Sequence, residues 1–204
     1  MMTDPVDQQF QIVSGFPEDQ RETAAALFWQ AFSGKLGKIL APDEKALSLI
    51  ARLLDPDFAI SALDEDGGLI GMAGFKTKEG GLVAGSLSDM TGVYGLFGGV
   101  WRGIVLELLE REPEPGLLLM DGIFVGAEAR GLGVGTALLS AICDTAVARG
   151  CSRVRLDVID TNPRARALYE RSGFVPAGTE ETGPFKYIFG FSSATRMEKP
   201  LQAA

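Results

Sequence analysis

The stretch Arg130-Gly131-Leu132-Gly133-Val134-Gly135-Thr136 decides the fold of this chain. Three glycines alternate in it, an apolar run precedes it at Leu117–Met120 and Ile123–Val125, and a helical pattern follows at Thr136–Arg149. This order predicts a strand that turns through glycines into the N-terminus of a helix. Backbone N–H groups and the helix dipole form an anion site at such a turn, and glycine lets a phosphate approach closely. The sequence therefore predicts a ligand that carries a phosphate or pyrophosphate.

Several loop types could explain the glycines. A Walker loop requires a lysine directly after its last glycine, and none stands here. A Rossmann fingerprint fits at Gly131 and Gly133 but lacks its third glycine, although Asp157 stands about twenty residues on, where that fold has its ribose-binding acid. The pattern Arg/Gln-x-x-Gly-x-Gly/Ala is satisfied by Arg130, Gly133 and Gly135. A glycine-rich turn without a ligand is the remaining interpretation.

The Arg/Gln-x-x-Gly-x-Gly/Ala pattern resembles the acetyl-coenzyme A loop of the GCN5-related N-acetyltransferase (GNAT) family. A second segment resembles that family too. It consists of an apolar strand at Val154–Val158, then Asn162, a short helix with alanines and Tyr169, and the pair Gly173-Phe174. The two signatures stand in the family's order, and the resemblance covers residues 117–175. It implies an α/β fold with a mixed, mostly antiparallel, twisted sheet flanked by helices.

The resemblance also implies how acetyl-coenzyme A (acetyl-CoA) is held. The pyrophosphate would contact Arg130 and the backbone of Gly131, Leu132, Gly133, Val134, Gly135 and Thr136. The strand residues Ile123, Phe124 and Val125 would pair with the pantetheine arm as an added strand does. Asn162 would donate a hydrogen bond to the same arm, and it is also suited to cap the helix that begins at Pro163. No metal is expected.

The implied reaction is direct transfer of the acetyl group to a primary amine. Tyr169 is the expected acid for the departing thiolate, and packing beside Phe174 is its structural alternative. Asp121 is the candidate base, because burial in an apolar strand would raise its pKa toward a useful range. A non-catalytic acyl-CoA sensor on the same fold is the alternative function.

Composition narrows the chemistry and the partners. The chain has no histidine, which excludes a Ser-His-Asp triad and argues against a zinc site. Its two cysteines and a start without signal-peptide character favour a cytoplasmic protein. The net charge of −8 argues against nucleic-acid binding. Residues 130–171 carry a net charge of +3 and the rest −11, which suits a polyanionic cofactor and a cationic small-molecule or peptide amine.

A pass along the chain predicts one N-acetyltransferase domain over residues 1–204, with a flexible tail at residues 1–8. Strands are expected at Phe10–Val13, Phe58–Leu63, Leu69–Lys76, Leu117–Val125, Val154–Val158, Lys186–Phe191 and Ala194–Lys199. Helices are expected at Pro17–Phe32, Pro42–Leu54, Thr136–Arg149 and Pro163–Arg171, with Gly150 ending the third.

The region Ser86–Glu112 has no motif but carries a continuous apolar stripe, with five glycines on the opposite side. The glycines predict a helix whose start is weak or broken. We expect this helix to pack on the sheet near the acceptor side, where it either lines or covers the acceptor pocket or simply packs in the core. A membrane span is the alternative, which the charges of Arg102 and Glu107 disfavour. A homodimer is the default expectation for the assembly.

Overall fold

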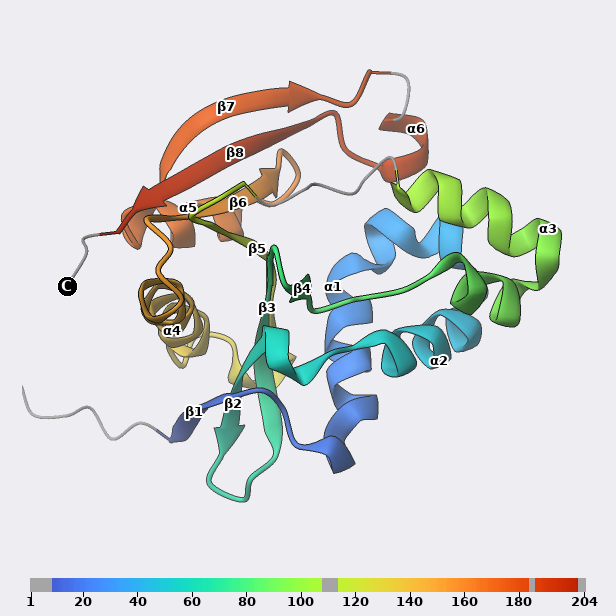
Figure 1. The fold of residues 1–204 in the computed structure, drawn as a ribbon. Coiled ribbons are helices and arrows are strands. Elements are labelled where there is room, and N and C mark those ends of the chain that lie inside the picture. Colours follow the sequence, from blue (N-terminus) through green and yellow to red (C-terminus); the bar gives the residue numbers. More distant parts are fainter. Residues whose placement is uncertain (1–8, 108–113, 184–185, 202–204) are drawn as a thin grey trace, which may run out of the picture.

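The computed structural model describes residues 9–107, 114–183 and 186–201 (Figure 1). The expected tail at residues 1–8 and the end of the 86–112 segment lie outside the described residues. The described residues form eight strands, six α-helices and three short 3₁₀ helices.

The strands form one sheet in the order β1-β2-β3-β5-β6-β8-β7, with β4 beside β3. Only the pair β5–β6 is parallel among the described strands. The mixed, mostly antiparallel sheet is thus confirmed, and it excludes the Rossmann interpretation, which needs a mostly parallel sheet. The strands are β1 (Phe10–Ser14), β2 (Ala59–Asp64), β3 (Leu69–Thr77), β4 (Gly80–Gly81), β5 (Leu117–Val125), β6 (Arg153–Ile159), β7 (Val175–Glu181) and β8 (Ser193–Pro200).

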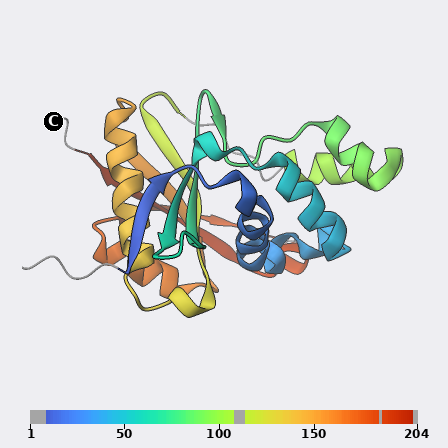
Figure 2. The same ribbon diagram turned by 90° about the horizontal axis from the view of Figure 1, so that it is seen from below.

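Helices cover both faces of the sheet, with α4 on one side and α1 on the other, and α2 packs on α1 (Figure 2). Helix α3 lies at the outer edge, against α2 and α1 (Figure 1). The helices are α1 (Arg21–Leu40), α2 (Asp43–Leu53), α3 (Leu87–Glu107), α4 (Val134–Ala148), α5 (Pro163–Arg171), α6 (Lys186–Phe189) and the 3₁₀ turns Glu18–Gln20, Pro56–Phe58 and Ala127–Ala129. None of the described helices is long and apolar enough to cross a membrane.

Helix α4 ends as the sequence predicts. Gly150 has φ 72°, and the amides of Gly150 and Cys151 donate to carbonyls of Val147 and Ala146 at 2.9 and 2.8 Å. This pattern closes the last turn and frees the chain to enter β6. Along the helix, a fully buried apolar face packs on the sheet and anchors the core; it includes Leu138, Leu139 and Ile142.

The expected strand at Lys186–Phe191 is wrong, because Lys186–Phe189 is a helical turn. On the side away from β6, the strand that pairs with β8 is instead β7. The sequence of β7, Val-Pro-Ala-Gly-Thr-Glu-Glu, has no apolar alternation because the strand lies at the sheet edge with every residue exposed. Helix α1 also differs from expectation, since it runs to Leu40 rather than ending at Phe32.

Helix α3 is broken in its middle. Gly95 has φ 73° and ψ 169°, so the chain turns there into a second helical half. The halves approach closely, since a Cβ on Gly99 would lie 2.5 Å from the backbone of Thr91. The weak start expected from the glycines is therefore a break. The two halves can touch because Gly99 has no Cβ.

The apolar stripe of α3 does not pack on the sheet, so that expectation is wrong. In the second half Leu96 and Phe97 are 69% and 88% exposed, whereas Gly99 and Gly103 face the first half of the same helix. Arg102 holds this half in place: its Nε donates to the carbonyl of Ile39 at 2.6 Å, at the C-terminal end of α1.

Candidate functional site

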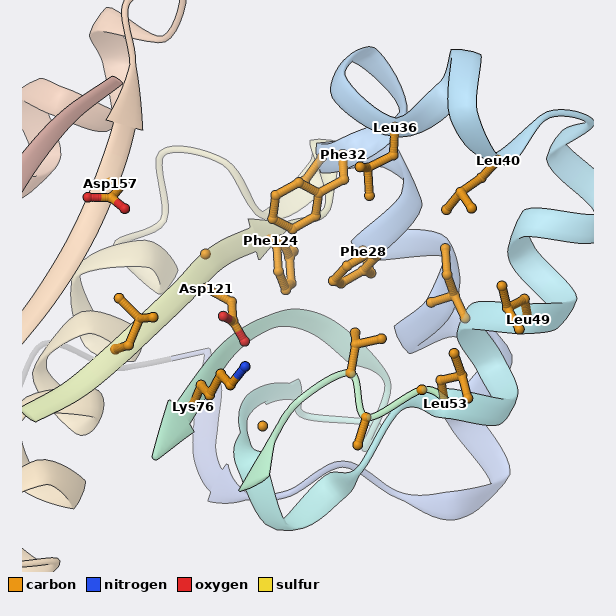
Figure 3. A pocket seen from close by; sticks show the side chains of 18 of the residues that line it. Phe28, Phe32, Leu36, Leu40, Leu49, Leu53, Lys76, Asp121, Phe124 and Asp157 are labelled. Carbon is orange, nitrogen blue, oxygen red and sulfur yellow. The ribbon is translucent and has the colours of Figure 1, made fainter. Parts of the chain in front are cut away.

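The parallel strands β5 and β6 separate after a short paired stretch. Leu117–Leu119 pair with Arg153–Arg155, and beyond this point β5 runs on to Val125 and β6 to Ile159 without pairing to each other. Figure 3 shows Asp121 on β5 set apart from Asp157 on β6. The splay leaves one edge of β5 open to an extended partner, because the opposite edge already pairs with β3.

A β-bulge sits where the strands separate. Gly74 pairs with Gly122 and Phe75 with Met120, so Asp121 is the extra residue of β5. Bulges redirect a side chain, and here Asp121 is exposed toward a cavity rather than buried. The expected burial of this carboxyl group is therefore wrong. Figure 3 shows the carboxylate of Asp121 and the amino group of Lys76 pointing toward one another.

A cavity of about 1430 Å³ extends from the splay to the helices. It brings together five residues that the sequence singles out: Asp121, Ile123, Phe124, Asn162 and Tyr169. Val125 and the loop from Arg130 to Thr136 do not line it. The glycine loop and the cavity are therefore two adjoining parts of one candidate site rather than a single pocket.

Tyr169 is buried at the wall of this cavity, with 7% of its surface exposed. Its ring centroid lies 6.2 Å from that of Phe174, so the packing role and a place at the cavity are both present. Burial raises the pKa of Tyr169 to about 12. The phenol therefore keeps its proton throughout the physiological pH range and can act only as a donor there.

The glycine loop has the backbone geometry of an anion site. Gly131 and Gly133 have φ 90° and 86°, and Gly133 precedes the first residue of α4. The amides of Thr136 and Ala137 both turn back to the carbonyl of Gly133 at 3.0 Å. The amide of Gly135 comes before this point, where a helix offers no acceptor of its own. It is available to an anion at the helix N-terminus.

Two further contacts tie the loop to the rest of the site. The Nε of Arg130 donates to the carbonyl of Val125 at 3.3 Å, at the end of β5. A Cβ on Gly135 would lie 3.3 Å from the side chain of Leu168, so α4 packs against the helix that carries Tyr169. That helix, α5, begins at Asn162, whose Oδ1 accepts from the amide of Ala165 at 3.1 Å. The expected capping role of Asn162 is confirmed.

The half of the cavity away from the splay is an apolar chamber, of which the sequence indicated only the wall from the 86–112 helix and not the walls from α1 and α2. We use this name for the part lined by α1, α2 and the second half of α3, namely Phe32, Leu36, Leu40, Leu49, Leu53 and Ile104. These residues carry no motif, and only the apolar faces of the helices could have indicated them. Lys76 was missed as well, since it is simply the last residue of a predicted strand.

Charge within the cavity is concentrated on the sheet side. Asp157 lies 3.4 Å from the buried guanidinium of Arg155 on the same strand. Among the residues that the structure describes, no group of three or more His, Cys, Asp or Glu side chains could hold a metal ion. The site as described offers backbone amides, a protonated phenol, carboxylates and the amino group of Lys76.

Comparison with known proteins gives the family. The model of the acetyltransferase (GNAT) family matches residues 21–174. Thialysine N-ε-acetyltransferase of Bos taurus is 38% identical over 56 residues, which are 28% of this chain and 33% of that protein. Mycothiol acetyltransferase of Beutenbergia cavernae is 49% identical over 61 residues, which are 30% of this chain and 20% of that protein. The chain thus spans a third or less of these two relatives.

Solved structures share the fold over almost the whole chain. A GCN5-related N-acetyltransferase from Kribbella flavida superposes with a TM-score of 0.62 at 21% identity, covering 96% of this chain and 100% of that one. A phosphinothricin acetyltransferase from Sinorhizobium meliloti, in complex with AcCoA, gives a TM-score of 0.55 at 19% identity and covers 95% and 89%. At this identity the likeness shows the fold alone.

Proposed function

This chain belongs to the acetyltransferase (GNAT) family, and from this premise we propose that it transfers an acetyl group from acetyl-CoA to a primary amine. The observation that carries the proposal is the splay between β5 and β6, with the glycine loop at one end and Tyr169 on its wall. A binding protein for the same cofactor needs the loop and the splay. Only transfer also needs a proton donor and an acceptor cavity.

The open edge of β5 suits the pantetheine arm of acetyl-CoA. Its amide and carbonyl groups beyond Leu119 have no strand partner on that side, and the amides of the arm can pair with them as an added strand does. Ile123, Phe124 and Val125 would make this pairing, with Asn162 beside them. Arg130 and the loop amides from Gly131 to Thr136 would hold the diphosphate.

Tyr169 is proposed to protonate the thiolate that leaves when the acetyl group moves. Acetyl-CoA supplies an activated thioester, and the chain supplies the proton. A phenol with a pKa of about 12 is a weaker acid than a thiol, whose pKa is about 8.5, so the proton has to move while negative charge develops on the sulfur and the C–S bond breaks, not by prior loss from the tyrosine. Because Tyr169 is buried beside Phe174, the hydroxyl is held in one place.

Asp121 is proposed to receive the proton of the amine, directly or through water. The bulge places this carboxylate at the point where the cavity opens from the splay, next to the strand that would hold the arm. An exposed carboxylate is a weak base, so its main contribution is attraction of a cationic amine and passage of its proton to solvent. The sign of the charge therefore matters more than its basicity.

The proposal is tested by binding and turnover measured on the same protein. Calorimetric titration should detect acetyl-CoA and not NAD. A screen of primary amines should then release free coenzyme A, detected with a thiol reagent. Burial raises the pKa of the Cys143 thiol, so we expect the protein to contribute little background. Binding of acetyl-CoA without turnover of any amine would favour the sensor alternative, and binding of NAD without binding of acetyl-CoA would refute the proposal.

The role of Tyr169 has its own test. We expect Tyr169→Phe to lower kcat by about 100-fold, the low end for a general acid, and to change the Kd of acetyl-CoA less than twofold. Tyr187→Phe is the matched control, because Tyr187 is 74% exposed and does not line the cavity. Equal rates for the two variants would remove Tyr169 as the proton donor.

The single domain, the cytoplasmic location and the homodimer stay predictions from the sequence.

A further inference from the structure

The cavity has two chemically different ends. Among its described lining residues, the charged side chains of Lys76, Asp121 and Asp157 lie on the sheet, and the remaining charge, Asp89, stands at the start of α3. The carboxylate of Asp89 is occupied, since it accepts hydrogen bonds from the amide and hydroxyl of Ser86 at 2.9 and 2.6 Å. The apolar chamber thus contains no charge of its own that is available to a ligand.

The chamber is built by packed side chains rather than by a chance gap. Leu40 and Leu49 are 3% and 1% exposed, and the ring of Phe32 lies 5.5 Å from that of Phe124 on β5. Figure 3 shows these side chains together with Leu36 and Leu53 on the side of Asp121 away from Asp157. The chamber therefore begins beside the carboxylate and extends away from the splay.

The volume leaves room for an acceptor with a body. Pockets for a drug-sized molecule measure about 300–1,000 Å³, whereas this cavity measures about 1430 Å³. Beyond the space between β5 and β6, a further molecule can place one end at Asp121 and the rest in the chamber. Burying apolar surface there is favourable, whereas burying a second charge or a polyhydroxy body without partners is costly.

We infer that the acceptor is an amine carried on an apolar body, an alkyl or arylalkyl amine, with its ammonium group at Asp121 and its body in the apolar chamber. This inference rests on the proposed function. A longer acyl chain on the donor could also fill the chamber, but it would be neutral and would not call for a carboxylate at the entrance. On the sheet side two described carboxylates, Asp121 and Asp157, line the cavity together with one ammonium group, Lys76, and this excess of negative charge beside an apolar interior favours the amine.

The first experiment compares three six-carbon amines that differ at the far end, together with one shorter amine. With acetyl-CoA fixed, kcat/KM is measured for n-propylamine, n-hexylamine, hexane-1,6-diamine and 6-aminohexanoate. We expect n-hexylamine to exceed n-propylamine by up to about fourfold per added methylene, and to exceed the diamine and the amino acid at least about tenfold. Equal or better turnover of the diamine or the amino acid overturns the inference.

Two variants of α3 provide a matched pair. Ile104 and Leu96 are 56% and 69% exposed on the same half of the helix, but only Ile104 lines the cavity. We expect Ile104→Asp to lower kcat/KM for n-hexylamine about tenfold or more and to reduce its advantage over the diamine. Leu96→Asp should do neither. Identical effects of the two substitutions contradict the placement of the amine body in the chamber.

The outcomes separate this inference from the proposed function. Acetylation of several amines without preference for an apolar body overturns the inference and leaves the proposed function standing. Binding of acetyl-CoA with no amine acetylated refutes transfer itself. If hexanoyl-CoA with n-propylamine is a better pair than acetyl-CoA with n-hexylamine, the chamber serves the acyl chain and the inference on the acceptor is wrong.

Discussion

Two glycines in the loop before α4 hold backbone angles that other residues rarely adopt. Gly133, with φ 86°, has no atom within 4 Å of the place where a Cβ would stand. Alanine fits there sterically, but it is strained in this conformation and its methyl group would project into the space that a diphosphate needs. A substitution at Gly133 should therefore have two separate effects: backbone strain, which lowers stability, and a clash with the ligand, which weakens binding.

We predict that Gly133→Ala weakens the Kd of acetyl-CoA about tenfold and lowers stability by roughly 1 kcal/mol. Gly67, in the β2–β3 turn, is the control because it has φ 81° and is equally open. Gly67→Ala should show the same loss of stability and an unchanged Kd. Calorimetry and urea unfolding measure the two quantities. If both variants bind acetyl-CoA as tightly as the unaltered protein, the loop does not hold the diphosphate.

The buried phenol of Tyr169 makes stability depend on alkaline pH. Its pKa is raised to about 12, so the unfolded chain, with a pKa near 10, loses this proton first. The contribution of this phenol to the free energy of unfolding is therefore complete below pH 10, and it is lost as the pH rises through 12. Between pH 9 and 11 we expect the unfolding free energy to fall by ~1.3 kcal/mol more in the unaltered protein than in Tyr169→Phe. Parallel losses in urea titrations would show that the phenol is not desolvated.

At the scale of elements, one arginine docks α3 on the body of the molecule. Besides its bond to Ile39, Arg102 donates to the carbonyl of Ala41 at 3.3 Å, and its guanidinium lies 4.2 Å from the ring centroid of Tyr94. These carbonyls belong to the C-terminal end of α1, where a cation is favoured. Since Ile104 follows on the same half-helix, the docking also sets one wall of the apolar chamber.

We predict that Arg102→Gln lowers stability by about 1.5–3 kcal/mol and raises the KM for the amine without changing the Kd of acetyl-CoA. Arg166→Gln is the comparison, because its ion pair with Glu170 is exposed at the surface and is worth less than about 1 kcal/mol. Thermal unfolding and steady-state kinetics measure the effect. If the Kd of acetyl-CoA changes as much as the KM for the amine, Arg102 does not act on the amine alone and the prediction is wrong.

The elements that the sequence predicts well are those with local signals at their ends. Helix α5 has its proline at the first position and its cap at Asn162, and its predicted bounds are the observed ones. Tyr187, Phe189 and Phe191 alternate like a strand, but a four-residue helix is too short for periodicity to reveal it. For α3 the apolar stripe was visible, whereas its direction depends on contacts between distant segments.

The candidate site divides in the same way. The proposed cofactor half follows from a motif, because backbone geometry requires glycines at fixed spacing. The proposed acceptor half, the apolar chamber, arises where three helices meet, and no residue type is required at any one of its positions. Asp121 shows the limit most clearly: in the sequence it is a polar residue inside an apolar strand, and only the register with β3 reveals the bulge that exposes it.

On the scale of the whole molecule, the sheet is two halves joined by a short paired stretch of β5 and β6. We predict that acetyl-CoA slows amide hydrogen exchange in residues 120–125 more than in residues 117–119, which β6 already pairs. Peptides covering the β2–β3 hairpin should not change. Uniform slowing across the sheet would mean that the ligand stabilises the fold globally without lying in the splay, and mass spectrometry of the exchanged peptides distinguishes the two results.

The splay has a kinetic consequence. Its strand edge and the loop at its end would grip the arm and the diphosphate, and both are the same before and after the acetyl group has moved. Most of the binding energy would therefore come from parts of the coenzyme that are the same in acetyl-CoA and in free coenzyme A. Spent coenzyme should compete with fresh donor for the free enzyme, and its departure should pace the catalytic cycle. A high ratio of free coenzyme A to acetyl-CoA in the cell would then lower the rate of transfer.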